Sequence, residues 1–540
     1  MRENFIKITV KILFLVLLLF GGSVFAQELC SQPVMTTEGK VVGTTDSKYS
    51  VCAWLGIPYA QPPVGELRFR APQPPQAHSG ILEAKEFGPA CIQEKSLFSG
   101  GKSIYGYSED CLTLNIWRPK KRGKFPVMFW IHGGGYTGGA SNYEMYNGAR
   151  LSAEQEVVVV SLNYRLNIFG FFAHPQASEE DPNHSSGNYG LLDQIQALKW
   201  VKNNIENFGG APENITIFGE SAGGVSVCAL LASPLAKGLF QKAIIESGAC
   251  DLFYPIEKGF KYGEKFAEQV GCEGKEALSC LRKIPAKKLF QKYKANKLPI
   301  SAYIDGYVLP ELPLESIRKG EFNQVPVMVG NNRDEMNLFL IPAGFYLLPG
   351  FVIKSVLKKA LGKELYHQLN QLYPRSKFGR PAKRTLIGAS EAFCSRGFMP
   401  AEELSRFVPV YYYQFDWDDY PLGKLLGAFH GLEIPFVFGN TRLKRDSLRI
   451  VMGTKKVAKK AEPLAKVMMS YWANFAKKGE PNGDNLPQWI SYHQENRQRI
   501  HLDLPEIEMK PISPDQLERY RFWASIDVSK LEEFLGTPAN

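Results

Sequence analysis

The 540-residue sequence lacks an apolar segment long enough to cross a bilayer. Its longest apolar run, residues 12–20, is shorter than the ~20 apolar residues that a transmembrane helix needs, so no stable membrane span is expected. The sequence also lacks a dense block of Lys and Arg, because the 64 basic and 54 acidic residues that give a net charge of +10 are spread along the chain. This distribution indicates that nucleic acid is not a partner.

Internal repeats, low-complexity tracts and long linkers are also absent, which predicts one mature domain over residues 27–540. Three basic residues precede the apolar run at the N-terminus, and Gly-Gly-Ser-Val-Phe-Ala follows it at residues 21–26. A positive start, a short apolar centre and small residues before Gln27 are typical of a secretory signal peptide over residues 1–26. A membrane anchor is the alternative, and the shortness of the run disfavours it. We expect a periplasmic or secreted protein.

Nine cysteines fit an oxidising compartment, and their odd number leaves at least one that is unpaired or pairs outside the chain. Two pairs are close enough in sequence to propose as disulfides, Cys91 with Cys111 and Cys272 with Cys280. The sequence assigns no partners to the other five, which are Cys30, Cys52, Cys228, Cys250 and Cys394. Cys228 lies in a small apolar helical segment and fits a buried, unpaired thiol.

Strand-like and helix-like segments alternate through the chain. Residues 41–70 predict short strands and turns, since they are rich in glycine, proline and β-branched residues. Further strands are expected at 112–117, 127–131, 157–160, 215–218 and 325–329, and a helix at 189–207. The alternation predicts an α/β fold with a mostly parallel central sheet that helices cover on both sides. The apolar segment 340–361 favours a core-packed helix pair, or else a wall of an apolar substrate cavity.

A G-x-S-x-G motif at residues 219–223 is the first signal of chemistry. It lies between the expected strand at 215–218 and an apolar helix, where a sharp turn lifts a serine hydroxyl above the sheet edge. Glycines on both sides of the serine let neighbouring backbone pass closely. Ser221 would also lie at a helix N-terminus, where the helix dipole favours developing negative charge. Ser221 is therefore the candidate nucleophile, with an ordinary small-residue turn as the alternative.

A run of three glycines after His132 is the second signal, because it directly follows the expected strand at 127–131. Attack of a serine on a carbonyl carbon creates an oxyanion, which needs N–H donors already in place. Consecutive glycines let backbone amides approach that point without obstruction. Gly134 and Gly135 are thus candidate oxyanion donors, together with the amide of Ala222 next to the nucleophile. Beside the serine motif, a plain glycine-rich turn is the weaker interpretation.

These motifs belong to longer stretches that resemble the type-B carboxylesterase/cholinesterase family of α/β-hydrolases. Residues 208–223, FGGAPENITIFGESAG, are similar to the family's nucleophile signature, and residues 109–117, EDCLTLNIW, are similar to its second signature. Residues 56–60 and 471–482 also match, so the resemblance covers nearly the whole mature chain. It implies the α/β-hydrolase fold and the two disulfides proposed from spacing.

The resemblance also implies the acid and the base. The family's acid is a glutamate in a D-E-G-like stretch after a core strand, which places it at Glu335, with Asp334 as a backup because Met336 replaces the usual glycine. The family's histidine lies in an H-G-x-E-I-x-F-V-F-G-like stretch, which residues 430–439 match, so His430 is the expected base. From the residues alone, a Ser–acid–His chain order leaves four candidates, His367, His430, His493 and His501.

Two further residues are expected to support this triad. Glu220 precedes the nucleophile within its motif, and Ser247 resembles a serine that supports the triad from behind. The predicted reaction is hydrolysis of a carboxylic ester through an acyl-enzyme on Ser221, which requires no metal and no organic cofactor.

The substrate is expected to be a small-molecule ester without a choline-like cation. Residues 91–111 contain no tryptophan where the cholinesterases hold a quaternary ammonium, and Leu338 stands where a further cation-facing aromatic is expected. We therefore predict a general carboxylesterase. The alternatives are an amidase or peptidase with the same triad, and a non-catalytic cholinesterase-like binding module. The sequence does not indicate an oligomeric state.

Overall fold

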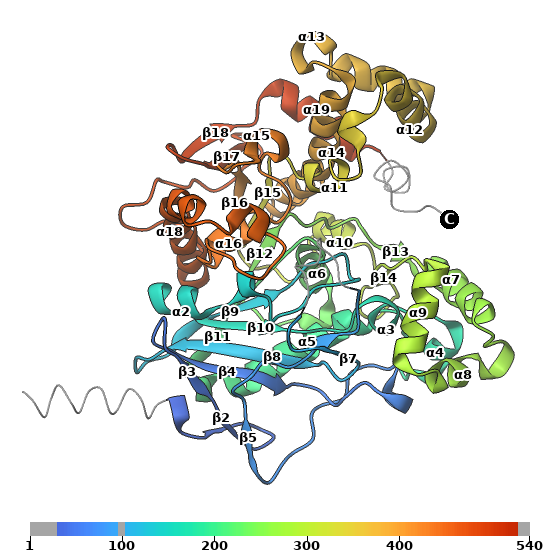
Figure 1. The fold of residues 1–540 in the computed structure, drawn as a ribbon, viewed down its shortest axis with the longest axis vertical. Coiled ribbons are helices and arrows are strands. Elements are labelled where there is room, and N and C mark those ends of the chain that lie inside the picture. The colour runs from blue at the N-terminus through green and yellow to red at the C-terminus, as the bar shows by residue number, and fades with distance from the viewer. Residues whose placement is uncertain (1–29, 95–102, 527–540) are drawn as a thin grey trace, which may run out of the picture.

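The computed structural model describes residues 30–94 and 103–526, so the predicted signal peptide over residues 1–26 lies outside the described residues. Its central element is one large sheet (Figure 1). The strands of this sheet are β3 (Thr44–Asp46), β4 (Val51–Pro58), β8 (Thr113–Pro119), β9 (Phe125–Ile131), β10 (Val158–Leu162), β11 (Gly210–Glu220), β12 (Lys242–Glu246), β15 (Val327–Asn332), β16 (Val410–Phe415), β17 (Gln498–Leu502) and β18 (Glu508–Pro511).

Most neighbouring strands in this sheet run parallel. Across the described residues the strand order is β18-β17-β16-β15-β12-β11-β9-β10-β8-β4-β3. Every pair from β17 to β10 is parallel, and the pairs at the two edges are antiparallel. The expected α/β-hydrolase architecture is confirmed, and the strands expected at 112–117, 127–131, 157–160, 215–218 and 325–329 each overlap one of these strands.

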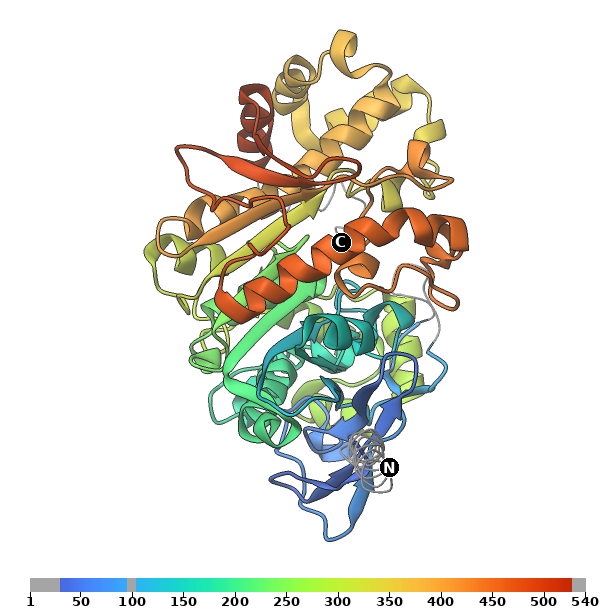
Figure 2. The same cartoon turned by 90° about the vertical axis from the view of Figure 1, so that its left-hand side faces the viewer.

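Two apolar layers enclose the sheet, because side chains along each strand point alternately to its two faces. In β9, Val127, Phe129 and Ile131 face one layer, whereas Met128 and Trp130 face the other. The first layer is covered by α5 (Tyr189–Asn204), α6 (Ala222–Ala232), α10 (Pro313–Lys319) and α14 (Pro381–Leu404). The second is covered by α2 (Ala149–Gln155), α16 (Ile434–Val437) and α18 (Lys455–Lys478), which runs across the strands in Figure 2.

Smaller elements surround this centre. Short strands pair apart from the large sheet: β1 (Val34–Met35) and β5 (Ile81–Glu83) flank β2 (Lys40–Val42), while β6 (Ala90–Cys91) pairs with β7 (Tyr107–Ser108), and β13 (Tyr254–Pro255) pairs with β14 (Tyr303–Ile304). The remaining α-helices are α3 (Asn167–Gly170), α4 (Pro175–Glu180), α7 (Ile256–Gln269), α8 (Ala277–Lys283), α9 (Ala286–Asn296), α11 (Asn337–Leu340), α12 (Gly350–Leu372), α13 (Arg375–Phe378), α15 (Gly423–Leu426), α17 (Arg449–Met452) and α19 (Pro514–Ala524). Among the described helices, none combines the length and the apolar character that a bilayer crossing requires.

The apolar segment 340–361 only partly behaves as a core-packed helix pair. Ile353 and Leu361, on the inner face of α12, are buried against Trp523 of α19. Leu347 and Phe351, in contrast, are 84% and 76% exposed. The prediction therefore holds for the inner face of α12 and is wrong for Leu347, in the turn before α12, and for Phe351, at the start of the helix.

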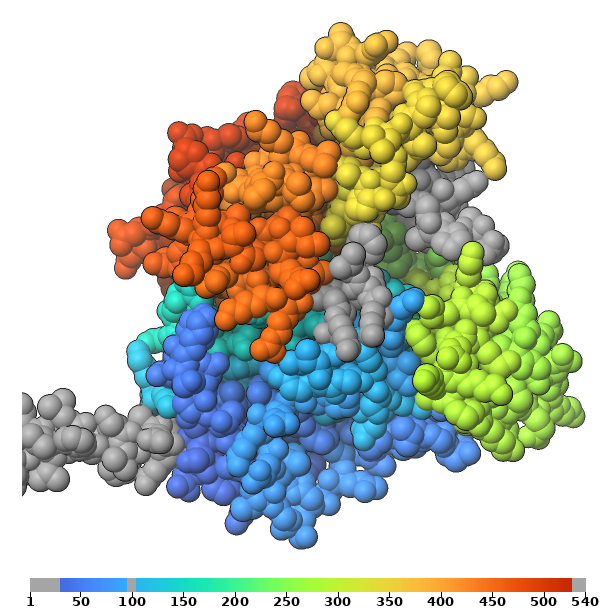
Figure 3. Space-filling model, in the orientation of Figure 1, coloured from blue at the N-terminus to red at the C-terminus, as the bar shows by residue number. Residues whose placement is uncertain are grey.

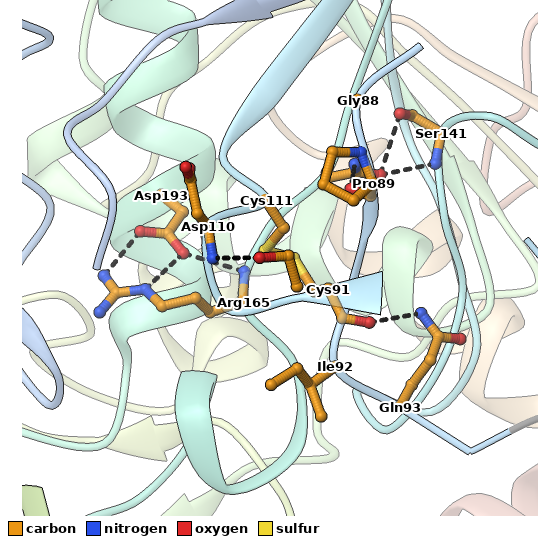
Figure 4. Close-up of a disulfide and its surroundings, with 12 residues drawn as sticks. Gly88, Pro89, Cys91, Ile92, Gln93, Asp110, Cys111, Ser141, Arg165 and Asp193 are labelled. Carbon is orange, nitrogen blue, oxygen red and sulfur yellow. Dashed lines mark hydrogen bonds and ion pairs between the residues drawn. A yellow bond between two sulfur atoms is a disulfide. The ribbon is translucent and has the colours of Figure 1, made fainter. Parts of the chain in front are cut away.

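Four disulfides join all but one of the nine cysteines. Cys91–Cys111 and Cys272–Cys280 are the two pairs expected from spacing, and Figure 4 shows the first beside the buried Arg165–Asp193 ion pair. The structure adds the pairs Cys30–Cys52 and Cys228–Cys250, and leaves Cys394 buried and free.

The interpretation of Cys228 as an unpaired thiol is wrong. Helix α6 packs against β12, and the chain that follows β12 brings the Cα atom of Cys250 to within 5.1 Å of the Cα atom of Cys228. Tertiary packing, which local composition does not encode, therefore decides this pairing.

Candidate active site

The candidate residues gather at one edge of the sheet, at the carboxyl ends of its parallel strands. The glycine loop follows β9, Ser221 follows β11, Ser247 follows β12 and Glu335 lies three residues beyond β15. His430 lies on the longer connection after β16. In open α/β sheets this edge is where ligands bind, so the fold alone brings together residues that are far apart in sequence.

Ser221 occupies a strained turn between β11 and α6. Its φ and ψ are 57° and −122°, which non-glycine residues rarely adopt, and its N–H donates to the carbonyl oxygen of Glu246 at 3.0 Å. Two residues later the chain passes so close to β9 that a Cβ atom on Gly223 would collide with the carbonyl oxygen of Ile131. The turn therefore requires glycine there, which explains the motif around the serine.

The glycine loop passes directly beside Ser221. A Cβ atom on Gly133 would lie 3.0 Å from Cβ of Ser221. Gly134 has a φ of 108°, and a Cβ atom there would collide with the carbonyl oxygen of Gly138. Both positions therefore require glycine, and the loop offers backbone N–H groups next to the serine.

Gln93 braces this loop, a role that the sequence did not reveal. Its side-chain amide donates to the carbonyl oxygen of Gly139 at 2.7 Å and accepts from the N–H of Gly139 at 2.9 Å. The same amide also donates to the carbonyl oxygen of Cys91 at 3.1 Å (Figure 4). The Cys91–Cys111 loop is thus connected to the glycine loop by a buried side chain.

Glu335 and His430 form a close buried pair. Nδ1 of His430 donates to Oε2 of Glu335 at 2.6 Å. The other carboxylate oxygen, Oε1, accepts from Oγ of Ser247 at 2.6 Å and from the N–H of Asn332 at 2.8 Å. Glu335 is completely buried, so both of its oxygens depend on these partners. Asp334, the backup acid, is turned elsewhere, and its carboxylate accepts from the N–H of Ala428 at 3.0 Å.

Glu220 contacts the opposite side of the imidazole. Its Oε1 lies 3.1 Å from Nε2 of His430. Burial raises the pKa of Glu220 to about 7, against the opposing effect of the nearby His430. Burial alone would lower the pKa of His430, but the carboxylates of Glu220 and Glu335 outweigh it and raise that pKa. The arrangement therefore stabilises the charged imidazolium from both ring nitrogens.

Two more buried carboxylates lie behind the site, and the sequence interpretation assigned a role to neither. Oε1 of Glu246 accepts from Nε1 of Trp472 at 2.7 Å, and burial raises the pKa of Glu246 to about 8. Glu433 accepts from the side-chain amide of Asn332, and burial raises its pKa well above the ordinary value. Glu246 and Glu433 lie in the sequence stretches around Ser247 and His430, and this proximity is the signal by which the sequence could have identified them.

A cavity of about 760 Å³ opens above these groups. Ser221, Glu220 and His430 line it together with the glycine loop. Its walls are mainly apolar and aromatic, with Phe290, Tyr293, Leu338, Phe339, Phe429 and Ile450 among them. Figure 3 shows the segments that carry α9, α11 and α17 (lime, yellow and orange) gathered around the middle of one face.

The position of Leu338 bears on the choice of ligand. Leu338 lines the cavity where the resemblance expects a cation-facing aromatic, and the next residue, Phe339, lies with its ring centre 5.4 Å from the ring centre of His430. Leu338 itself therefore presents an aliphatic side chain, and not an aromatic face, to the cavity. Within residues 30–94 and 103–526 there is also no group of three or more His, Cys, Asp or Glu side chains that could hold a metal ion.

Comparison with known proteins agrees with this arrangement. Residues 31–523 match the carboxylesterase family. The chain is 39% identical to the para-nitrobenzyl esterase of Bacillus subtilis, over 92% of this chain and 99% of that protein, and 37% identical to liver carboxylesterase 1 of Oryctolagus cuniculus, over 85% and 87%. Among solved structures, the carboxylesterase EST55 of Geobacillus stearothermophilus superposes with a TM-score of 0.79 at 33% identity, covering 91% of this chain and 99% of that one.

Proposed function

Because the chain belongs to the carboxylesterase family and is a serine hydrolase of carboxylic esters, we propose that Ser221 is its nucleophile, His430 its base and Glu335 its acid. One observation carries this assignment: Nδ1 of His430 is held by Glu335 at 2.6 Å beside the cavity that Ser221 lines. A proton held on Nδ1 leaves Nε2 as the basic nitrogen.

The reaction then proceeds through an acyl-enzyme. Nε2 of His430 takes the proton of the Ser221 hydroxyl as its oxygen attacks the ester carbonyl, and the imidazolium that forms returns the proton to the departing alcohol. Water, deprotonated in turn by His430, releases the acid. The carboxylates of Glu335 and Glu220, which flank the ring, favour the imidazolium in both steps.

Backbone amides stabilise the oxyanion in this proposal. The N–H groups of Gly134 and Gly135 lie in the loop that passes beside Ser221, and the N–H of Ala222 is the first of helix α6. Each such donor is worth about 3 kcal/mol in the transition state. Ser247 acts through Glu335, because its hydroxyl fixes the carboxylate that orients the imidazole.

We further propose a neutral small-molecule ester as the substrate. The apolar cavity, Leu338 in its wall and the absence of tryptophan from residues 91–111 support a general carboxylesterase over a choline-specific one.

The four disulfides are consistent with a secretory or extracellular location. We propose that residues 1–26 direct export to the periplasm or the medium and are removed, which leaves one domain over residues 27–540. N-terminal sequencing of the exported protein would then begin at Gln27, and a start at Met1 would contradict the proposal.

The deciding experiment compares the mature protein with a Ser221→Ala variant on p-nitrophenyl acetate and p-nitrophenyl butyrate. We expect turnover by the wild type and its loss in the variant. Activity that survives in the variant would contradict the assignment of Ser221. The matching anilides provide the control for an amidase with the same triad, since an amidase would cleave them and an esterase would leave them intact. A folded wild type that cleaves none of these substrates would favour a binding role.

A further inference from the structure

A second cavity, of about 130 Å³, lies between α12, α14 and α19. It shares no lining residue with the cavity above Ser221. Ile353 and Leu357 of α12, Ala389 of α14 and Trp523 of α19 supply its apolar walls. Ligand sites usually combine apolar walls with a few polar groups. This cavity has that composition, is partly open to solvent and is small enough to limit the ligand to a few carbon atoms.

The charges around this cavity have one sign. Lys354 and Arg384 line it, and no aspartate or glutamate does. In the described part of the chain, neither of these cations has an acidic partner. Nη2 of Arg384 donates to Oδ1 of Asn370 at 2.7 Å, but its Nε is buried without a hydrogen-bond acceptor. Burial also lowers the pKa of Arg384.

A buried guanidinium N–H without an acceptor is unusual in folded proteins, because leaving such a donor unpaired costs free energy. Arginine pairs most strongly with planar anions such as carboxylates. The cationic side chains of Arg384 and Lys354 beside an apolar space therefore favour a ligand with two parts. One part is an anionic acceptor, and the other is a hydrocarbon chain that fills the apolar walls.

We propose that this cavity binds a short-chain aliphatic carboxylate, with its head group at Arg384 and Lys354 and its chain against Ile353, Leu357 and Trp523. Hydrolysis of an aliphatic ester releases an acid of this class, so the ligand is chemically a product of the enzyme. The proposal does not depend on the roles assigned to Ser221, His430 and Glu335.

Helix α14 connects this cavity to the active site. The helix lines the cavity with Arg384 and Ala389, and one residue beyond Ala389 the hydroxyl of Ser390 accepts from the N–H of Met336 at 3.1 Å. Further along, the ring centre of Phe393 lies 5.2 Å from that of His430. A ligand that shifts α14 therefore alters the surroundings of the catalytic histidine, so its inhibition is of the mixed type.

Gly388 offers a way to fill the cavity without removing any charge. A Cβ atom there would lie 3.5 Å from Cζ2 of Trp523 and 3.7 Å from Cζ of Tyr373, which are ordinary contacts. A leucine side chain at this position would extend into the space that the hydrocarbon chain needs. Gly388→Ala is the matched control for the backbone, since it adds one methyl group at contacts that the structure allows.

The test is calorimetric titration of the mature protein with hexanoate, and with hexan-1-ol as the neutral probe. We expect wild-type protein to bind hexanoate at least tenfold more tightly than hexan-1-ol. Arg384→Gln and Gly388→Leu should each weaken hexanoate binding at least tenfold, while Arg384→Lys retains most of it. Thermal unfolding identifies any variant that does not fold, and if Gly388→Leu is such a variant, Arg384→Gln carries the test, with Gly388→Ala as the control that should keep the wild-type affinity.

Inhibition of p-nitrophenyl acetate hydrolysis separates the two cavities. The competitive component of hexanoate inhibition reports binding above Ser221, so its inhibition constant should be the same in all of these variants. The uncompetitive component reports binding in the second cavity, and this inhibition should become weaker in Arg384→Gln and Gly388→Leu. Equal hexanoate affinity in the wild type and both variants would overturn the proposal. Equal affinity of the wild type for hexanoate and hexan-1-ol would overturn the assignment of a carboxylate.

Discussion

Replacing Glu220 with glutamine should shift the pH dependence of hydrolysis toward acid. The Glu220 carboxylate lies 3.1 Å from Nε2 of His430 and helps to raise the pKa of that imidazole. In the proposed mechanism, His430 accepts the proton of Ser221 only when Nε2 carries none. Since the neutral side chain of Glu220→Gln no longer favours the imidazolium, the pKa of His430 falls and the basic form becomes available at lower pH.

The size of this shift follows from the contact. Two unit charges about 4 Å apart interact by about 1 kcal/mol in water and by about 4 kcal/mol at an effective dielectric constant of about 20. One pKa unit corresponds to about 1.4 kcal/mol, so the range is about one to three units. The pKa of Glu220, raised to about 7, lies below that of His430, raised to about 9, so the Glu220 carboxylate is ionised where His430 titrates. We therefore expect the pKa of His430 to fall by about one to three units in Glu220→Gln.

The assay is kcat/KM for p-nitrophenyl acetate between about pH 5 and about pH 10, because this quantity reports ionisations of the free enzyme. Glu94→Gln is the matched control, since Glu94 borders the same cavity but pairs with Lys294 and does not contact His430. Its acid limb should stay near that of the wild type. A midpoint for Glu220→Gln that stays at or above the wild-type value would refute the argument.

Three further predictions follow from the site and from the cysteines. Glu335→Gln should lower kcat about 10⁴-fold, because the oxygen of glutamine stays with its donors Ser247 and Asn332 while its NH2 group donates to Nδ1 of His430 and leaves the ring proton on Nε2. Asp334→Asn, which does not contact the imidazole, should lower kcat less than tenfold, and equal losses in the two variants would contradict the assignment of Glu335 as the acid. Gly134→Ala should lower kcat at least about 10²-fold, because its Cβ would displace the loop that carries the proposed oxyanion donors. Gly135→Ala, whose Cβ would meet nothing closer than 3.9 Å, should lower kcat less. A larger loss of kcat in Gly135→Ala than in Gly134→Ala would contradict the loop geometry. A thiol-reactive dye should label no cysteine of the folded, unreduced protein and only Cys394 after denaturation, as counted by mass spectrometry; a second labelled site would disprove one of the disulfides.

The parts of the site that the sequence predicted are those set by local backbone. The turn at Ser221 and the glycine loop each require small residues at fixed spacing, so their motifs are visible in the chain. Glu335 and His430 carry no such local signature. They were expected only because long stretches around them resemble a known family, and spacing alone left four histidines open.

The parts that the sequence did not predict depend on contacts between distant segments. Gln93 reaches Gly139, and Trp472 reaches Glu246, across many intervening residues. The exposure of a side chain also depends on distant segments. Phe351 is apolar, as core residues usually are, but it lies on the surface because none of the described elements covers it. Such contacts follow from how the helices and loops pack on the sheet.

The four disulfides join neighbours in the order of the cysteines along the chain. The first cysteine pairs with the second, the third with the fourth, the fifth with the sixth and the seventh with the eighth, and each pair closes a loop of 22 residues or fewer. If the chain is exported as proposed, a thiol oxidase that acts on it as it emerges from a translocation channel would meet the cysteines of each native pair one after the other. Oxidation in that order would produce this connectivity without a disulfide isomerase.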